Sequence, residues 1–475
     1  MAQEYLYEKL ASELVTKIKT GVYQAGSKLP SVRLFASEHS VSVATAVTAY
    51  YTVESFGYIE ARPKSGFYVK AVTLDTVDSP AESTPDSIPQ IVTGQEMVLQ
   101  LVKATNQPQM VQFGAAVPDT TYLPISQVTK AIKKASNEQG KMICNYLFPP
   151  GLSQLREQLA RRMNGIQCSV YKENIVITDG CQEAIRLALR ACAEPGDVIA
   201  IESPTFYGLL QVIQSLRMRA IEIPTHPEEG ISIEALELAV EQWSIKACVL
   251  VPTFGNPLGC NMSDDRKQKL VDLLSDREIP IIEDDVYGEI SHSLPRPKPL
   301  KAFDKKDWVI YCSSFSKSLS PGLRVGWTVS KRFYDRLEYF KYVSNLATSS
   351  VAQLAVVDIL QSGKYDRYLA TVRKQHAFSV NKMTALIAQF FPSGTKVTKP
   401  KGGFVLWVEL PFELDTFELA NRLIKKNISI APGKIFSMTD KYNHFLRLSC
   451  AVVWNRQAEA ALIEIVHEIN TMQSL

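Results

Sequence analysis

The chain has 475 residues, which at roughly 100–200 residues per domain predicts two to four folding units. Hydrophobic residues make up 46% and charged residues 21%, a balance that is typical of a globular protein and excludes a disordered or fibrous chain. The chain has 52 Lys and Arg against 49 Asp and Glu, so its net charge of +3 does not indicate nucleic-acid binding by the whole molecule. Any basic DNA-binding face must therefore be local.

The eight cysteines form no C-x-x-C pair and have no metal-ligand spacing with histidine, so we expect no structural metal. Several lie in apolar runs such as 247–250, where thiols behave as small buried hydrophobes. We expect them to be reduced, in a cytoplasmic protein. The chain shows no basic segment followed by an apolar one at its start, and no run of about 18 apolar residues, which predicts neither an export signal nor a membrane span.

Residues 1–70 have the pattern of three helices followed by a hairpin. Apolar residues at helical spacing predict the first helix, ending at Gly21. Ser31 and Ser42 are placed to cap the second and third helices with their side-chain oxygens. The third helix ends at Gly57, and two short strands around the basic turn 62–66 then form a wing. The core side of this third helix consists of Ala46, Ala49, Tyr50, Val53 and Phe56.

This segment resembles the GntR-type winged helix-turn-helix through three motifs, which are Lys-Leu-Pro-Ser-Val-Arg at 28–33, Val-Ser-x-x-Thr at 41–45 and Gly-Tyr-Ile at 57–59. The resemblance implies that the start of the third helix enters the major groove of DNA operator half-sites. It assigns DNA contacts to Arg33, Ser42, Thr45, Arg62 and Lys64. Val43 departs from the family, which usually has arginine there. The alternative is a small helical domain that binds protein, because the segment is only slightly basic.

Residues 71–95 are rich in Val, Asp, Ser, Thr and Pro without an apolar period, which predicts a flexible linker that lets the front domain swing. From residue 96 to 475, short β-rich apolar runs alternate with amphipathic helices. That alternation predicts an α/β fold around a largely parallel sheet.

Glycine or polar residues follow several predicted strands of this large region. The strand 175–178 runs into Gly180, Cys181 and Gln182 and then a helix, whose free amides and positive dipole end suit a phosphate, although glycine turns before helices are also common structural features. Another apolar strand, from residue 281, stops at three acids and Tyr287. Ligands bind at such strand ends in open α/β sheets, and the alternative is a solvated loop. Asn256 follows a third strand and precedes a proline that favours a turn.

Lys317 lies among small hydroxyl side chains, and Arg324 follows seven residues later. A lysine amine that is desolvated near positive charge becomes nucleophilic and forms Schiff bases with carbonyl compounds. An arginine can hold a phosphate by two hydrogen bonds, and the hydroxyls of Ser314 and Ser316 can complete the shell. A lysine in a serine-rich loop is otherwise commonly a solvent-exposed residue.

Taken in order, the segments of roughly 110–455 resemble the fold-type I pyridoxal-phosphate aminotransferases, and with the front domain they resemble the MocR subfamily of GntR-type transcription regulators. The resemblance implies an aminotransferase fold with large and small subdomains, the cofactor pyridoxal 5'-phosphate, and Lys317 as the lysine of the internal aldimine. It implies that Asp284 pairs with the pyridine nitrogen and that Tyr287 and Asn256 bond the phenolic oxygen. It assigns the phosphate to Gly180, Cys181, Gln182, Ser314, Ser316 and Arg324, ring stacking to Phe206 or else Tyr207, the neighbouring subunit's phosphate to Tyr146, and a ligand's α-carboxylate to Arg447.

We therefore expect a homodimeric transcription regulator in which an amino compound, reacting at Lys317, changes the placement of the DNA-binding domains. A working aminotransferase with an accessory DNA-binding domain is the first alternative, because nothing in the motifs removes transamination. The second alternative is a DNA-binding protein whose large domain serves only for dimerisation and binds no cofactor.

Overall fold

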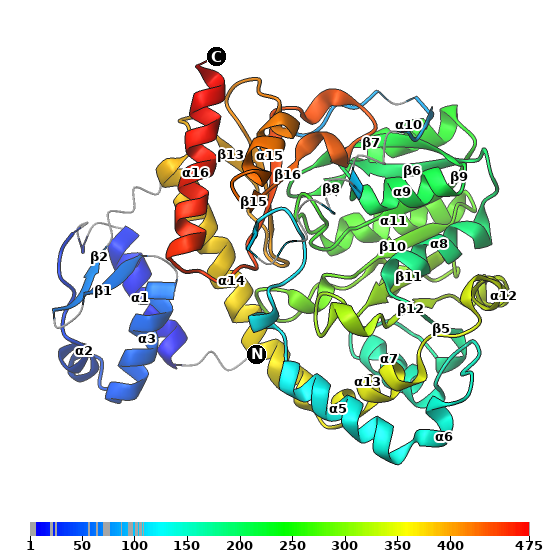
Figure 1. Cartoon of the computed structure of the whole chain (residues 1–475), viewed down its shortest axis with the longest axis horizontal. Coiled ribbons are helices and arrows are strands. Elements are labelled where there is room, and N and C mark those ends of the chain that lie inside the picture. Colours follow the sequence, from blue (N-terminus) through cyan, green and yellow to red (C-terminus); the bar gives the residue numbers. More distant parts are fainter. Residues whose placement is uncertain are drawn as a thin grey trace. The chain divides into compact units, whose positions relative to one another are not determined.

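The computed structural model describes the chain except residues 1–5, 20–21, 24–25, 56–57, 63–64, 70–76, 87, 94–97, 100–102, 104–106, 108 and 475. It divides into two compact units. The first comprises Met1–Asp78 and Phe378–Thr395, and the second comprises Ser79–Ala377 and Lys396–Leu475. In Figure 1 the helices and strands of Met1–Asp78 are blue and the large unit runs from cyan to red.

The N-terminal region contains three helices and a two-stranded antiparallel hairpin, in the order that the sequence predicts. They are α1 (Leu6–Lys19), α2 (Val32–Glu38), α3 (Val43–Ser55), β1 (Ile59–Arg62) and β2 (Gly66–Val69). Both predicted caps are confirmed, because Ser31 Oγ accepts from the backbone N–H of Leu34 at 3.2 Å and Ser42 Oγ accepts from that of Thr45 at 3.1 Å.

The core of this region is formed by the faces that the helical spacing predicts. Leu14 of α1, Phe35 of α2 and Ala46, Ala49 and Tyr50 of α3 are all buried within one apolar cluster. Buried aromatic rings reinforce it, since Phe35 and Tyr50 meet edge to face with 5.1 Å between ring centroids. Four residues of the predictions lie outside the described part of the chain, namely Gly21, Phe56, Gly57 and Lys64.

The large unit is built on one mostly parallel sheet, as the alternation of elements predicts. Its strand order is β3-β7-β6-β9-β10-β11-β12-β5, with β8 paired to β7. The strands are β3 (Gln90–Ile91), β5 (Ile175–Thr178), β6 (Val198–Ser203), β7 (Arg219–His226), β8 (Gly230–Ile231), β9 (Ile245–Leu250), β10 (Ile281–Asp284), β11 (Val309–Ser314) and β12 (Gly326–Val329). The pairs from β7 through β11 are parallel, and β12 is antiparallel to both of its neighbours.

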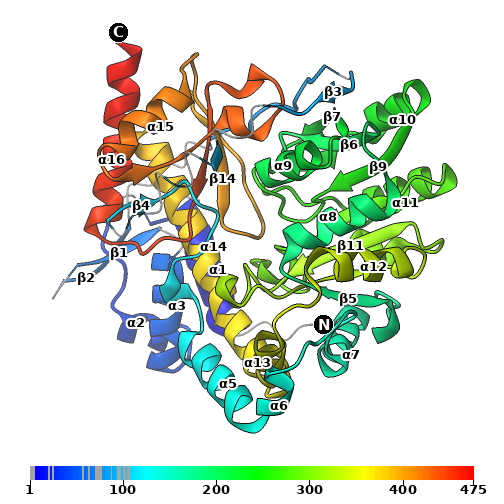
Figure 2. The ribbon, with the colours of Figure 1, turned by 45° about the vertical axis from the view of Figure 1, so that its right-hand side comes forward.

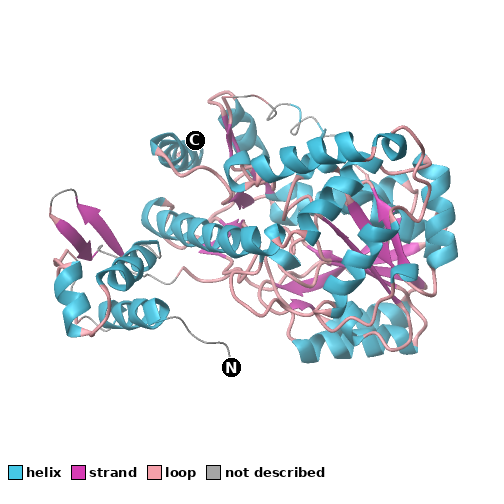
Figure 3. Cartoon of the chain, turned by 90° about the horizontal axis from the view of Figure 1, so that it is seen from below, coloured by secondary structure: helices cyan, strands magenta, loops and turns pink. Residues whose placement is uncertain are grey.

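Helices cover both faces of this sheet, so its central strands are apolar along their whole length (Figure 3). On β6, Ile199 and Ile201 face a cluster that includes residues of α8 (Cys181–Cys192) and α9 (Tyr207–Ser215). The alternate residues Val198 and Ala200 face α10 (Ile233–Gln242) and α11 (Asp264–Asp276). The other helices of this part are α5 (Ile125–Glu138), α6 (Gly140–Ile143), α7 (Ser153–Asn164), α12 (Tyr334–Asn345) and α13 (Ser350–Gln361). The helix α14 (Lys364–Phe390) begins in the large unit, and its residues from Phe378 onward belong to the first unit.

A second, antiparallel sheet forms the smaller subdomain of the large unit, with the order β13-β14-β17-β16. Its elements are β13 (Lys396–Val397), β14 (Val405–Glu409), β16 (Ala431–Pro432), β17 (Phe445–Ser449) and the helices α15 (Thr416–Ile424) and α16 (Arg456–Gln473). Figure 2 shows α15 and α16 side by side. A separate parallel pair joins β15 (Ile428–Ser429) to β4 (Val111–Gln112), so the start of this domain is tied to its C-terminal part.

Part of the predicted linker of residues 71–95 belongs to the large unit. Residues 71–76 lie outside the described part, but from Ser79 onward the segment belongs to the large unit. Ser83 Oγ donates to the carbonyl of Ser203 at 2.6 Å, and β3 pairs antiparallel with β7. The prolines that suggested a linker keep this stretch extended, and an extended chain is suited to lie along an existing sheet edge.

None of the helices in the described ranges combines the length and the apolar character that crossing a bilayer requires.

Candidate cofactor site

A pocket of about 280 Å³ lies where β10 and β11 end and α8 begins, at the ends of the parallel strands where ligands bind in open α/β sheets. It brings together ten of the side chains that the sequence predicts for a cofactor. These are Cys181, Gln182, Phe206, Asn256, Asp284, Tyr287, Ser314, Ser316, Lys317 and Arg324. They come from six segments spread over about 140 residues, which meet because the parallel strands end at the same edge of the sheet.

One end of the pocket has the components of a phosphate site. Gly180 has a φ of 98°, a backbone conformation that other residues rarely adopt, so this position favours glycine. A Cβ there would also lie 2.5 Å from Arg324 Nη2, so the guanidinium would have to shift. Arg324 donates from Nη2 to the carbonyl of Asp179 at 2.7 Å and from Nη1 to Ser316 Oγ at 3.3 Å. These bonds hold the guanidinium beside the N-terminus of α8, where free amides and the helix dipole favour an anion.

The amine of Lys317 donates to the carbonyl of Ala116 at 2.6 Å. Burial, followed by the nearby positive charge of Arg447, lowers the pKa of this amine to about 8. With this pKa, roughly a tenth of the amine is unprotonated at pH 7, far more than for a lysine at its ordinary value, and the unprotonated form is the one that attacks a carbonyl carbon.

Asp284 ends β10 and is the carboxylate that faces this lysine across the pocket. Its Oδ1 accepts a hydrogen bond from the thiol of Cys181 at 3.0 Å and another from the backbone N–H of Val286 at 3.2 Å. Burial raises its pKa to about 6, although both hydrogen bonds act in the opposite direction. The sequence grouped Cys181 with the phosphate, and the structure instead directs its thiol to the acid.

Asn256, Tyr287 and Phe206 complete the walls that the resemblance assigns to the cofactor ring. The amide of Asn256 is buried, and neither its Oδ1 nor its Nδ2 makes a hydrogen bond of good geometry with the described residues, although the amide lies close enough to Tyr287 to favour the ionised form of that phenol. Tyr287 is buried, which raises the pKa of its phenol. The ring of Phe206 lies 4.7 Å from that of Tyr207, and both side chains line the pocket. An unpartnered buried amide is costly, so Asn256 is suited to a ligand atom.

Arg447 lies directly behind the pocket wall rather than in it. The residue is fully buried on β17, opposite Ala431 of the neighbouring strand β16, and its Nη2 donates to the carbonyl of Gly114 at 2.7 Å. Both Gly114 and Ala431 line the pocket. Nε and Nη1 of Arg447 have no hydrogen-bond partner in the described part of the chain. Burial without an anion lowers the pKa of the guanidinium.

The structure keeps Tyr146 away from this pocket. Its side chain is 70% exposed and stacks on Phe148 with 5.5 Å between ring centroids. Phe148 in turn lies 6.0 Å from the ring of Tyr342 on α12. Within one chain, Tyr146 has no contact with the cofactor residues that line the pocket.

Sequence reasoning missed the loop that follows β4. Gly114, Ala115, Ala116 and Val117 line the pocket, and two of their carbonyls accept hydrogen bonds from Lys317 and Arg447. A Cβ on Gly114 would lie 2.8 Å from the carbonyl oxygen of Ile430, so the close approach of two backbones requires glycine there. The run of three small residues is the one local signal that could have indicated such an approach.

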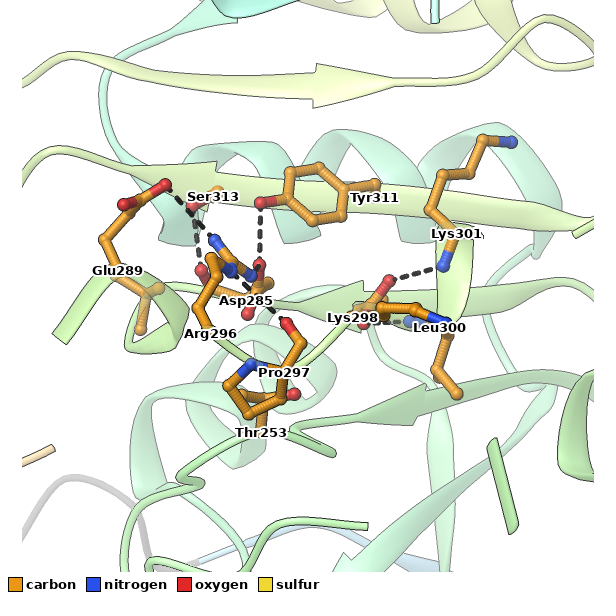
Figure 4. A network of polar contacts seen from close by, with 12 residues as sticks. Thr253, Asp285, Glu289, Arg296, Pro297, Lys298, Leu300, Lys301, Tyr311 and Ser313 are labelled. Carbon is orange, nitrogen blue, oxygen red and sulfur yellow. Dashed lines mark hydrogen bonds and ion pairs between the residues drawn. The ribbon is translucent and has the colours of Figure 1, made fainter. Parts of the chain in front are cut away.

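The three acids at the end of β10 are buried, which excludes the solvated-loop alternative. Glu283 accepts hydrogen bonds from the backbone N–H groups of Leu300 and Lys301, and burial raises its pKa to about 8. Figure 4 shows that Asp285 instead bonds Arg296 at 2.5 Å and the hydroxyl of Tyr311 at 2.8 Å. Only the middle acid of the three lines the pocket.

The residues assigned to DNA lie at the start of α3, on α2 and in the hairpin. Arg33, Ser42 and Arg62 are exposed, and Thr45 is half-buried. Ser42 and Thr45 share a hydrogen bond of 2.8 Å between their hydroxyls. Arg62 is paired with Glu60 at 2.8 Å and lies over the ring of Tyr68 at 4.3 Å, so binding a phosphate would require it to exchange partners. Lys64 is outside the described residues.

Fold and site together define a chain that joins a winged helix-turn-helix to an aminotransferase-type pocket. The family model "Aminotransferase class I and II" matches residues 108–465, and the model "Bacterial regulatory proteins, gntR family" matches residues 6–69. The chain therefore belongs to the regulators that fuse a GntR helix-turn-helix domain to a class I and II aminotransferase domain, the architecture of the MocR type.

Known relatives match either nearly the whole chain or about three quarters of it. The uncharacterized HTH-type transcriptional regulator YjiR of Escherichia coli (strain K12) is 38% identical over 459 residues, covering 97% of each chain. Aromatic-amino-acid aminotransferase 1 of Thermococcus litoralis is 29% identical and covers 75% of this chain and 87% of its own. The crystal structure of Pyrococcus horikoshii kynurenine aminotransferase aligns with a TM-score of 0.74 and 28% identity, over 79% of this chain and 94% of that one.

Proposed function

We propose that this regulator binds pyridoxal 5'-phosphate through Lys317 and that an amino compound reaching the cofactor alters how the protein binds DNA. The observation that carries the proposal is the pocket itself, in which a deprotonatable lysine, a buried carboxylate and an arginine at a helix N-terminus face one space. A domain that served only for dimerisation would have no use for three partly unpaired charges in one cavity.

The residues present fit this cofactor. Both hydrogen bonds that Asp284 accepts from the described residues end on its Oδ1, so Oδ2 is left for the pyridine N–H. The unpartnered amide of Asn256, with Tyr287, suits the phenolic oxygen, and Arg324 with Ser316 and the amides of α8 suits the phosphate. When bound, pyridoxal phosphate supplies an aldehyde that reacts with amines and a ring that withdraws electrons.

The chain's own residues then have separable roles. Lys317 presents an amine that loses its proton more readily than an ordinary lysine, because burial and Arg447 disfavour its charged form. Asp284 holds a proton at the ring nitrogen, and its position in a dry site makes that interaction stronger than it would be in water. Arg447 binds the carboxylate of an incoming ligand with its unpartnered N–H groups.

The DNA-reading residues of the proposal are Arg33, Ser42, Thr45, Arg62 and Lys64, and a homodimer would present two such heads to operator half-sites. Tyr146, Phe148 and Tyr342 form an exposed aromatic group on the large unit, which supports a second copy of the chain as its partner. Sedimentation of the full chain tests this assembly, and a monomer at micromolar concentration would contradict it.

The decisive experiment compares the full chain with Lys317→Ala and with Lys331→Ala, which removes an exposed lysine outside the pocket. We expect wild type and Lys331→Ala to turn yellow with pyridoxal phosphate and to retain it after borohydride reduction, and Lys317→Ala to do neither. Electrophoretic shifts with genomic fragments, with and without cofactor, should change in the first two proteins only. Equal shifts for all three would refute cofactor-dependent regulation.

Aminotransferase activity is the second candidate, favoured by the 29% identity to a named aminotransferase and by the presence of the lysine, acid, tyrosine and arginine in one pocket. It predicts release of a keto acid from added amino acids with repeated turnover. A sensor would instead give a lasting change in the cofactor's absorbance without keto-acid release.

A further inference from the structure

The pocket wall that remains after the cofactor residues are set aside is apolar. Tyr207 is the one polar side chain that lines the pocket outside the predicted cofactor set, within the described ranges. The other side chains include Val98, Val117, Ile430, Ala431, Pro432 and Ile435. Val98, Ala431 and Ile435 belong to one buried cluster that also contains Phe436, so this wall is continuous with the core of the smaller subdomain.

This apolar wall adjoins the seat proposed for a carboxylate. Arg447 pairs with Ala431 in the strand register, and its guanidinium lies over the ring of Phe436 at 5.6 Å. Its Nε and Nη1 are buried without partners in the described part of the chain. The pocket wall in front of Arg447 is therefore apolar, since Ala431 lies beside it in the sheet and Val98 and Ile435 belong to the same cluster as Ala431.

The charges around the pocket balance for a ligand with one carboxylate and one amine. Asp284, Lys317 and Arg324 line the pocket, and Arg447 lies behind the wall. The proposed cofactor pairs its ring nitrogen with Asp284 and its phosphate with Arg324, and it occupies Lys317. Arg447 is left for one carboxylate, and the described residues that line the pocket offer no further cation or anion.

We propose that the ligand is an α-amino acid with an uncharged, apolar side chain, which lies against Val98, Ala431 and Ile435 while its carboxylate pairs with Arg447. This inference rests on the proposed function, because it places the ligand's amine at the cofactor. A charged side chain would lose its hydration against this wall without gaining a partner, and that cost excludes acidic and basic amino acids.

The first test uses the full chain loaded with pyridoxal phosphate and follows the cofactor's absorbance during titration with L-leucine, L-methionine, L-aspartate and L-lysine. Leucine and aspartate have the same number of side-chain heavy atoms and differ in charge. We expect leucine and methionine to produce half of the change at concentrations at least a hundredfold below those of aspartate and lysine. Leucine should also produce half of the change at a concentration at least tenfold below that of 3-methylbutylamine, which lacks the carboxylate. An equal or better response to aspartate or lysine would overturn the inference.

The second test changes which amino acid the pocket prefers by introducing a charge into the apolar wall. Ile435→Lys places a cation in the apolar wall, and Ile435→Met keeps the wall apolar at similar volume. We expect the Lys variant to respond to aspartate at lower concentration than to leucine, and the Met variant to keep the wild-type order. If the Lys variant binds cofactor and still prefers leucine, the side chain does not lie at Ile435.

The outcomes separate this inference from the proposed function. Protein that stays colourless with pyridoxal phosphate contradicts the proposed function itself. Protein that binds the cofactor at Lys317 but responds best to charged amino acids, or to none of the four, contradicts only the ligand class.

Discussion

Asp284 and Asp285 are consecutive residues whose carboxylates meet opposite surroundings. Asp284 faces the pocket and accepts hydrogen bonds from a thiol and a backbone N–H, and it forms no ion pair within 4.0 Å in the described structure. Asp285 points to the other side of the strand end, where Arg296 and Tyr311 bond it. Glu289 extends that second group by pairing with Arg296 at 3.3 Å (Figure 4).

The difference shows that one of two neighbouring acids stabilises the fold while the other is available to a ligand. In the network around Asp285 most charged groups have partners, so it can hold the end of β10 in place without any ligand. On the pocket side, cations outnumber the one carboxylate, and the amide of Asn256 and the guanidinium of Arg447 retain unused hydrogen-bonding groups. Such incomplete pairing is costly in a folded protein, and a bound ligand would offset that cost.

The largest loss of stability is expected from breaking the ion pair between Arg296 and Asp285. Arg296→Met leaves Asp285 buried without its cation, and we expect a loss of about 3–5 kcal/mol in the free energy of unfolding. All five tryptophans lie in the large unit, so urea unfolding followed by tryptophan fluorescence reports on that unit alone.

Arg161→Met is the matched control, because Arg161 pairs with Glu157 on the surface of α7, where both side chains are about half exposed or more. Its cost should stay below about 0.5 kcal/mol. Equal effects for the two arginines would mean that the network around Asp285 contributes no more than a surface ion pair.

The next largest effect is a gain in stability, from removing the charge of Asp284. Burial raises the pKa of Asp284 to about 6, above the ordinary value of about 3.9, so above pH 6 the cofactor-free protein keeps a charge that costs on the order of 1–3 kcal/mol. Asp284→Asn should therefore stabilise the cofactor-free protein by about that amount at pH 7, and the gain should shrink as the pH falls from 6 to 4.

The control for Asp284→Asn is the same change from Asp to Asn at the next residue. Asp285→Asn removes the partner of Arg296 and should destabilise the protein under identical conditions. Urea midpoints at pH 4, 6 and 7 distinguish the two variants. A loss of stability for both at pH 7 would show that Asp284 also has a structural role.

The sequence predicts the parts of this arrangement that are local. The strands, the caps at Ser31 and Ser42, and the polar residues at strand ends all follow from short-range patterns, and the parallel sheet then gathers ten cofactor residues in one pocket. The contacts that it does not predict join distant segments. Lys317 bonds a carbonyl 201 residues away and Arg447 bonds one 333 residues away, and no periodicity in the chain encodes either pairing.

The smallest effect is expected at Cys181, whose thiol supplies one of the two hydrogen bonds to Asp284. The acceptor is a carboxylate but the thiol is a weak donor, so we expect this bond to contribute about 0.5–1.5 kcal/mol, and Cys181→Ala should weaken pyridoxal phosphate binding about three- to tenfold at pH 7. Cys181→Ser keeps a donor at this position and should bind the cofactor within about twofold of wild type. Titration by absorbance measures both.

The serine variant also tests why a thiol occupies this position. A thiol is a weak donor, so it orients the carboxylate while leaving most of the negative charge for the ring nitrogen. With the thiol in place the pKa of Asp284 is about 6. A hydroxyl bonds the carboxylate more strongly and should lower this pKa, whereas alanine, which offers no donor, should let it rise. If the alanine variant binds cofactor as tightly as wild type, the thiol only fills space at the start of α8, and Asp284 is positioned by the strand end alone.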